Sequence, residues 1–470
     1  MTHFYSRLTA IQQPACAMMG IIASVVLGLI AASSASAVES AIVIEQCTLF
    51  DSQSGEILPD RTIVVHGDQI VAVHKPGEKV EIPAGAQRID GRGKFVLPGL
   101  IDAHVHLVHV LDYAHVTGDE VLPLYLAAGV TSVRSTGDEV VAETLVARFA
   151  AVHPQSSPRV FTCSPLLDAD PPIHRDIGRG VINPAEVPAL LDDMLRWNVT
   201  TIKIYAGTGR EVGKAIIEEG HRRKIFVTAH LGRYSAQDAV ADGIDGLEHI
   251  WSVFNYVIPS EVASQPGHRG KLDLDNPLCQ QLVAELARRK VYVDPTLAVF
   301  RNMILLSDVP EVRNHPDNAL VPKRLLDFWP VYLQRTGCPQ GGPLDDRRRE
   351  FAKFQELTGK LHRAGVPLLV GTDSPEPQVT PGFSLHQELE MLVESGLSPA
   401  AALQAATLNN AAALRQETHL GSISPGKLAD LVLLTANPLE DIRNTRRIDV
   451  VIRGGIVAKP AELLKLVPKE

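Results

Sequence analysis

The chain has few cysteines and no long run of basic residues. Only five cysteines occur among 470 residues, and no two of them form a Cys-x-x-Cys pair, which excludes a zinc-ribbon protein. The formal net charge is −9, and the densely charged residues 345–350 mix both signs. This balance argues against a nucleic-acid binder. We find no internal repeat and no low-complexity tract after residue 37.

Charge is also scarce at the start of the chain. Arg7 is the only Lys or Arg in the first 37 residues, which contain no Asp or Glu, and residues 18–32 are almost uninterruptedly apolar. The small residues Ala35-Ser-Ala37 follow, as at a cleavage site. This layout predicts a secretory signal peptide over residues 1–37 and an exported protein, periplasmic or secreted. The apolar run is shorter than the roughly 20 residues of a membrane span, so no stable membrane anchor is expected after cleavage.

The cysteines that follow this segment lie far apart in the sequence. They are Cys47, Cys163, Cys279 and Cys338. We expect buried free thiols, with disulfides as the alternative in an exported protein.

Short alternating runs at both ends of the chain predict β-strands. The runs are residues 41–44, 62–66, 69–74, 429–434 and 449–458. Clusters of Asp, Ser, Gly and Pro separate the first three, as turns between strands would. We expect one small β-sandwich domain built from residues 38–97 and 421–470.

Between these ends, β-branched segments alternate with helical stretches. After an opening strand at Phe95, the strand candidates are residues 130–133, 159–163, 199–205, 224–230, 246–250, 290–295 and 366–373. The helical stretches include residues 184–197, 210–223 and 276–289. Eight strands alternating with helices predict an α/β fold, a (β/α)8 TIM barrel over residues 98–420. Residues 252–275 and 297–364 interrupt the alternation and are expected to be insertions, the second a lid rather than core.

Side chains that bind metals stand at the ends of several expected strands. The six candidates are His104, His106, Lys203, His230, His249 and Asp373. His104 and His106 are two residues apart in one strand, so both point to the same face. Active sites of TIM barrels lie at the C-terminal ends of the strands, so the six are expected to meet at one mouth. Because imidazole is the commonest metal ligand, the set predicts a metal site.

Lys203 indicates the kind of site. A lysine among isoleucines is costly to bury as a cation, and a nearby metal ion would favour its neutral form. A neutral amine can add CO2 to become a carbamate, whose two oxygens can bridge two cations and reduce the excess positive charge by one. Schiff-base chemistry is the alternative for a lysine in a barrel, but it leaves four histidines unexplained.

Several motifs together resemble the amidohydrolase superfamily. They are Pro98-Gly-Leu-Ile-Asp-Ala-His-Val-His106, Lys203, His230, His249, Gly371-Thr-Asp373 and Pro425-Gly-Lys-Leu-Ala-Asp-Leu-Val432. Residues 383–403 and 405–413 resemble the imidazolonepropionase-related, prolidase-like branch. Imidazolonepropionase itself uses one metal ion and lacks the strand-four lysine. Lys203 therefore makes the chain similar to members with a carboxylated lysine and a binuclear metal centre.

The resemblance implies a metal-dependent hydrolase with two divalent ions. His104, His106 and Asp373 are implied to hold one ion, and His230 and His249 the other, with the lysine carbamate and a hydroxide between them. The hydroxide is implied to attack the substrate. Asp373 takes the proton of the hydroxide as a general base and then delivers it to the leaving amine as a general acid. Zinc is expected because imidazole-rich sites suit it, with manganese, cobalt and iron as alternatives.

Candidate substrate-binding residues follow from position. Tyr205 lies two residues beyond Lys203 on the same strand face and could donate to a carbonyl or carboxylate. Arg134, near the end of the second strand, is expected to clamp a terminal carboxylate, with a structural ion pair as the alternative. His386 is a further candidate, which could orient a metal ligand rather than contact the substrate.

The predicted reaction is hydrolysis of the amide bond of a small dipeptide-like substrate, such as an Xaa-Pro or N-acyl amino-acid amide. The same site suits a lactonase, a phosphotriesterase, a deaminase or a cyclic-amide hydrolase. A non-catalytic scaffold is the alternative of a different class, but it predicts missing ligands. The expected partner is a small molecule, and a homo-oligomer is compatible with the sequence.

Overall fold

The computed structural model describes residues 41–470. The predicted signal peptide, residues 1–37, lies outside these residues. Between residues 41 and 470, no helix has both the length and the apolar character needed to cross a membrane. The four cysteines in this part of the chain are free thiols, and all but Cys338 are buried.

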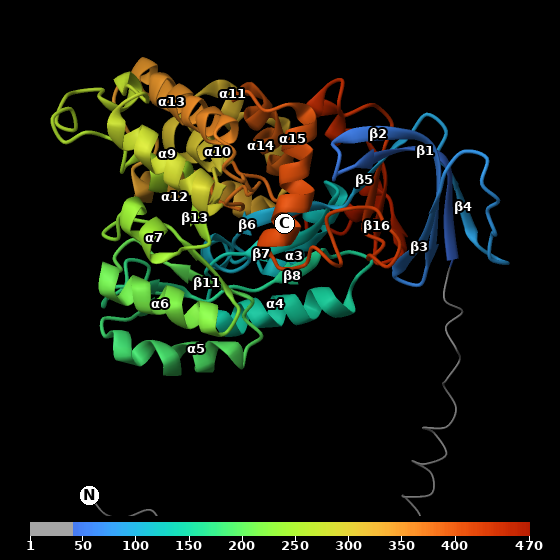
Figure 1. The fold of residues 1–470 in the computed structure, drawn as a ribbon, viewed down its shortest axis with the longest axis horizontal. Coiled ribbons are helices and arrows are strands. Elements are labelled where there is room, and N and C mark those ends of the chain that lie inside the picture. The colour runs from blue at the N-terminus through green and yellow to red at the C-terminus, as the bar shows by residue number, and fades with distance from the viewer. Residues whose placement is uncertain (1–40) are drawn as a thin grey trace, which may run out of the picture. The chain divides into compact units, whose positions relative to one another are not determined.

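The two ends of the described chain build one eight-stranded sheet. Its strands are β1 (Ala41–Asp51), β2 (Glu56–His66), β3 (Gln69–His74), β4 (Gln87–Asp90), β5 (Phe95–Pro98), β15 (Leu431–Leu434), β16 (Ile448–Arg453) and β17 (Ile456–Ala458). β5 pairs in parallel with β1 and antiparallel with β15, so the blue N-terminal strands adjoin the red C-terminal ones (Figure 1). Strand alternation places Ile42, Ile44, Leu431 and Leu433 in one apolar cluster.

This sheet differs from the predicted sandwich of two facing sheets. The edge strand β3 curls back to the segment before β15, where Gln69 and Leu428 form an antiparallel bridge. A backbone hydrogen bond of 2.8 Å from Ile70 to Lys427 supports the bridge. The small β-unit is therefore a single curled sheet around one core.

The middle of the chain contains two parallel sheets. Their strands are β6 (Leu100–Val105), β7 (Val130–Ser135) and β8 (Arg159–Phe161) in one, and β9 (Leu166–Asp168), β10 (Gly178–Gly180), β11 (Thr201–Ile204), β12 (Phe226–Ala229), β13 (Gly246–Glu248) and β14 (Tyr292–Asp294) in the other. The predicted opening strand at Phe95 is divided at Gly99 between β5 and β6. A side chain at Gly99 would collide with Thr131, which explains the glycine at this close approach.

Isolated bridges join the edges of the two parallel sheets. Cys163 pairs with Thr201, which connects the end of β8 to β11. Val293 pairs with Leu368, and Ser374 with Val105, so the segment 366–374 lies between β14 and β6. This segment stands where the eighth strand was predicted, although it forms no continuous ladder. The pairings follow the order of strands in a (β/α)8 barrel.

Helices cover the outside of the parallel strands. They are α2 (His109–Tyr113), α3 (Gly118–Ala127), α4 (Val140–Val152), η1 (Pro184–Glu186), α5 (Val187–Leu195), α6 (Arg210–Arg222), α7 (Ala236–Asp242), α8 (Ile250–Phe254), η2 (Arg269–Lys271), α9 (Pro277–Arg289), α14 (Phe383–Glu394), α15 (Pro399–Gln404), η5 (Ala405–Asn409) and α16 (Asn410–Ala413), with η6 (Ile442–Arg446) and α17 (Pro460–Leu463) near the end. α4 contacts β8, α6 contacts β12, and α5 and α6 lie side by side (Figure 1). Asn276 begins α9 by accepting a 3.0 Å hydrogen bond from the Cys279 amide.

The segment 297–364 is helical and belongs partly to the core. Its elements are α10 (Leu297–Val299), η3 (Phe300–Leu305), α11 (Pro310–Arg313), η4 (Pro316–Leu320), α12 (Lys323–Thr336) and α13 (Leu344–Arg363). Phe300, Trp329 and Phe354 are buried in the same apolar cluster as the barrel strands. The expectation of a lid rather than core is therefore wrong for much of this segment, because these large side chains are buried within that cluster.

An ion pair fastens the barrel to the small sheet. Arg159 in β8 donates to both carboxylate oxygens of Asp430, at 2.8 and 3.1 Å, and the Gly454 amide donates to the same carboxylate at 2.7 Å. The Asp430 side chain is only 3% exposed. Removal of a buried carboxylate that satisfies three donors leaves an uncompensated cation.

We therefore expect Asp430→Ala to lower the free energy of unfolding by about 3 kcal/mol, as measured by urea denaturation. The control is Asp193→Ala, which breaks an exposed 3.4 Å pair with Arg196. That change should cost less than about 0.5 kcal/mol. Equal losses in the two variants would contradict a structural role for the Asp430 pair.

Candidate metal centre

The six predicted ligands lie together at the C-terminal ends of the parallel strands. They are His104 in β6, His106 directly after it, Lys203 in β11, His230 after β12, His249 after β13 and Asp373 in the segment 366–374. Five of them, all except the fully buried His104, line one cavity. The positions thus converge although they span 270 residues of sequence, from 104 to 373.

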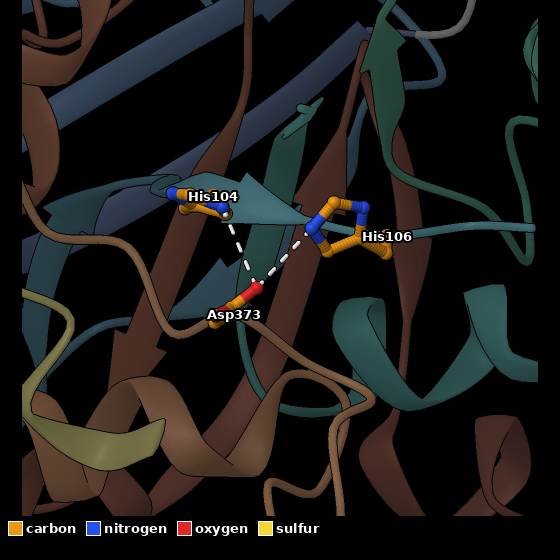
Figure 2. A group of neighbouring side chains, drawn as sticks. All are labelled: His104, His106 and Asp373. Carbon is orange, nitrogen blue, oxygen red and sulfur yellow. Dashed lines mark ion pairs between the residues drawn. The ribbon is translucent and has the colours of Figure 1, made fainter. Parts of the chain in front are cut away.

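Asp373 lies between the first two histidines. Its Oδ1 atom is 3.4 Å from His104 Nε2 and 3.2 Å from His106 Nε2 (Figure 2). Lys203 Nζ is 3.1 Å from the same His104 nitrogen. Donor atoms of His104, His106 and Asp373 lie within 4.8 Å of one another. Two imidazole nitrogens and a carboxylate at this spacing suit a divalent transition metal.

The other two histidines complete the group. The ring centroids of His230 and His249 are 4.6 Å apart, and those of His249 and His104 are 4.7 Å apart. His249 Nδ1 is 2.7 Å from Thr296 Oγ1, which fixes the orientation of the ring. The cluster is therefore continuous from His106 through His104 to His230.

Burial lowers the pKa of most of these groups. The pKa of His104 is lowered to about 4 and that of His230 to about 3, mainly because burial removes the hydration of the charged form. Lys203 contributes to both shifts. Burial likewise lowers the pKa of Lys203 and of His249. Neutral imidazole and neutral amine nitrogens have free lone pairs, which metal binding and carbamate formation require.

His106 differs from the other histidines. Burial works against its protonation, but Asp138 and Asp373 outweigh this and raise its pKa to about 10. Asp138 is buried and accepts backbone hydrogen bonds from Leu107, Val108 and His109 at 2.7 to 3.2 Å. A metal ion at His106 would have to displace a proton.

Glu248 was not predicted, yet it is central to the site. Its Oε2 is 2.8 Å from His104 Nδ1, and its Oε1 accepts from Arg134 at 2.6 Å and from Thr228 at 2.7 Å. A carboxylate on the far nitrogen of a ligand histidine fixes the tautomer and the ring orientation. His249 has a φ of 65°, so the strand alternation stops there and both Glu248 and His249 face His104.

Two predicted substrate residues lie away from the cavity. Arg134 is completely buried and donates to Glu248 and to the Ala103 carbonyl, so it is the structural ion pair of the alternative reading, not a carboxylate clamp. His386, on α14, is 1% exposed and its Nδ1 is 2.9 Å from Thr445 Oγ1. A substrate in the cavity cannot reach either side chain in this arrangement.

The cavity has a volume of about 390 Å³ and two different walls. Tyr205 lies on the polar wall, with its ring centroid 4.9 Å from His230 and 5.5 Å from His174. An apolar wall includes Trp251 and Phe300, whose rings stack at 5.6 Å. A cavity of this size and mixed character suits a small organic molecule.

The fold and the donor cluster define the class of protein. Residues 95–457 match the model of the amidohydrolase family, and the chain belongs to this family. It is accordingly a hydrolase of amide bonds, and divalent metal ions are typical of the family.

Similar proteins indicate the branch of the amidohydrolase family to which the chain belongs. The imidazolonepropionase of Geobacillus kaustophilus is 24% identical over 445 residues, which covers 85% of this chain and 90% of the relative. A protein of Bifidobacterium longum provisionally called a prolidase is 26% identical with a TM-score of 0.68, covering 92% and 98% of the two chains. An Xaa-Pro dipeptidase with bound methionine shares the fold, at 21% identity and a TM-score of 0.66, covering 89% and 100%. The chain therefore lies in the imidazolonepropionase and prolidase-like branch.

The Glu248 contacts lead to a test of metal affinity. Glu248→Gln should weaken metal binding by about 10- to 100-fold, because the neutral amide orients His104 less firmly and leaves Arg134 unpaired. The matched control is Thr228→Val, which removes one hydrogen bond to Glu248 but keeps the carboxylate. Competition with a chelator measures both affinities. A Glu248→Gln protein that binds metal as tightly as Thr228→Val would contradict this role.

Proposed function

We propose that the chain is a metal-dependent hydrolase that cleaves the amide bond of a small dipeptide-like or N-acyl amino-acid substrate. The observation that carries the proposal is the convergence of four histidines, Asp373 and a buried lysine whose pKa is lowered by burial, five of which line one cavity of about 390 Å³. Membership of the amidohydrolase family supports the amide bond as the target.

The donor set supports a binuclear arrangement. In this proposal His104, His106 and Asp373 hold one ion, and His230 and His249 hold the second. Lys203, whose amine nitrogen lies 3.1 Å from His104 Nε2, would become an anionic ligand on adding CO2 and releasing a proton to form a carbamate. Zinc fits the imidazole-rich ligand set. Divalent ions at such a site supply Lewis acidity and a water that is acidic near neutral pH.

The residues of the chain then have distinct tasks. Asp373 accepts the proton of the attacking water and later donates it to the leaving amine. Tyr205 keeps its phenolic proton because burial raises the pKa of the hydroxyl, so it can donate a hydrogen bond to the substrate. Its place beside His230 in the cavity wall suits contact with the carbonyl oxygen.

The apolar wall suits a hydrophobic substituent of the substrate. Trp251, Phe300 and Met303 line it. The relatives named as a prolidase and an Xaa-Pro dipeptidase support amides of amino acids. The relative named imidazolonepropionase supports the alternative, hydrolysis of a cyclic amide. Lys203 favours the amides of amino acids, because imidazolonepropionase lacks the lysine from which a carbamate could form.

The N-terminal sequence supports export as a further part of the proposal. Residues 1–37 combine one early basic residue, an apolar run and a small-residue cleavage pattern. A chain purified from an oxidised extracellular compartment and beginning near residue 38 would agree with this.

Replacement of Lys203 tests the bridge. Lys203→Ala should lose most amide hydrolysis, because no anion is left between the two ions, and added short-chain carboxylates should restore part of it. Lys214→Ala is the control, since this lysine lies in α6 with a side chain that is 52% exposed. Full activity of metal-loaded Lys203→Ala without any carboxylate would contradict the carbamate.

The metal content tests the binuclear arrangement separately. We expect about two divalent ions per chain by elemental analysis, because six donors exceed what one catalytic ion needs. Removal of both ions by a chelator should abolish turnover, and their return should restore it. A protein that holds a single ion with undiminished turnover would refute the second site.

A further inference from the structure

Glu376 is a cavity residue with no task in the mechanism above. It lies three residues after Asp373, and its backbone amide donates to the Asp373 carbonyl at 3.2 Å. The Val379 amide donates to the Glu376 carbonyl at 2.8 Å, which fixes the turn from the other side. The Glu376 side chain is only 8% exposed and lines the cavity. A carboxylate is therefore presented to whatever occupies the cavity.

Within residues 41–470, this carboxylate has neither a hydrogen-bond partner nor an ion-pair partner, and its Oε2 atom is completely buried. The other buried carboxylates around the site are bound. Asp138 accepts from backbone amides, Glu248 from Arg134, and Glu388 from the Leu297 and Ala298 amides at 2.9 and 2.7 Å. Even Asp294, which has one unpartnered oxygen, accepts from the Gly371 amide at 2.9 Å with the other.

His106 and His109 act on Glu376 electrostatically, but neither side chain is bonded to it. Lys203 is the only lysine or arginine in the cavity wall, and it belongs to the metal centre. The Tyr332 hydroxyl, also in the wall, is 3.3 Å from His109 Nε2. Burial of an unpaired carboxylate is costly unless a donor or cation joins it. The natural complement is a cationic group of the ligand, which makes the strong form of hydrogen bond.

We propose that Glu376 binds the free α-ammonium group of the substrate, and so selects dipeptides over N-acyl amino acids. This inference rests on the proposed function and names its substrate class. In a dipeptide, the amine is attached to the carbon next to the scissile carbonyl, so its anchor has to lie close to the proton-transferring carboxylate. Glu376 meets this condition because it shares one short turn with Asp373. An N-acyl amino acid has no group to occupy this position.

The test compares two substrates that differ only in the amine. For the C-terminal residue that gives the fastest turnover, kcat/KM is measured with the leucyl dipeptide and with its 4-methylpentanoyl analogue, which lacks the amino group. The wild-type protein, loaded with metal, should prefer the dipeptide by about 10- to 100-fold, as for a charged hydrogen bond. Glu376→Gln, which keeps the size of the side chain, should bring the ratio close to one by slowing only the dipeptide.

Asp192→Asn serves as the control. Asp192, in α5, has a side chain that is 63% exposed, pairs with Arg223 and does not line the cavity, so loss of its charge should leave the ratio as in the wild type. Metal content and melting temperature are measured for each variant. Equal slowing of both substrates by Glu376→Gln, or loss of metal from that variant, would overturn the inference, because Glu376 would then carry protons or bind metal.

The outcomes also separate this inference from the function on which it rests. A wild-type protein that hydrolyses the analogue as fast as the dipeptide, or faster, refutes the ammonium site and leaves the amide hydrolase standing. A metal-loaded wild-type protein that hydrolyses neither compound, nor any other dipeptide or N-acyl amino acid, refutes the proposed function and the ammonium site with it.

Discussion

The carboxylate of Glu248 is the contact on which the site depends. It joins His104 of β6, Arg134 of β7 and Thr228 of β12 to its own strand β13, and these strands belong to two separate parallel sheets. Burial alone would raise the pKa of Glu248, but Arg134 and His104 outweigh it and hold the pKa well below its usual range. The charge is retained because it is surrounded by donors, and its partners are fixed in turn. The same bonds that connect the two sheets thus also direct His104 Nε2 toward Asp373.

Backbone strain is concentrated at the same end of the barrel. Positive φ values occur at three residues around the site: 65° at His249, 47° at Thr296 and 66° at Asp373. Residues other than glycine seldom adopt this region, and it is least favourable for a β-branched residue such as threonine. Each of these conformations places a side chain against the cluster, since Thr296 bonds His249 and Asp373 lies between the two first histidines. Glu388 holds the backbone just after Thr296 through two amides. The surrounding hydrogen bonds therefore offset a conformational cost that the ligand geometry requires.

This strain also explains what the sequence could and could not reveal. The alternation of strands and helices, and the ligand types at the strand ends, are periodic signals, so the barrel order and all six converging side chains could be predicted. Glu248 could not, because strict alternation places it opposite His249, and only the positive φ of His249 brings both to one side. Arg134 carried no sequence signal that would distinguish a substrate clamp from a buried partner. The curl of the small sheet depends on the bridge between Gln69 and Leu428, which are too distant in sequence for any local pattern to indicate.

The distribution of charge inside the cavity is the last consequence of this architecture. Burial lowers the pKa of His104, His230 and Lys203, which favours neutral nitrogen donors there, whereas the neighbouring carboxylates raise the pKa of His106. The neighbouring histidines hold the pKa of Asp373 well below its usual range despite burial. This carboxylate is therefore available as a ligand. Glu376 is different, because no histidine or backbone donor is bonded to it and burial raises its pKa to about 7. The cavity thus offers neutral nitrogen donors to metal cations, and the turn after Asp373 presents a single unpaired carboxylate. A ligand that pairs with this carboxylate has to place its own cationic group beside the bond to be cleaved.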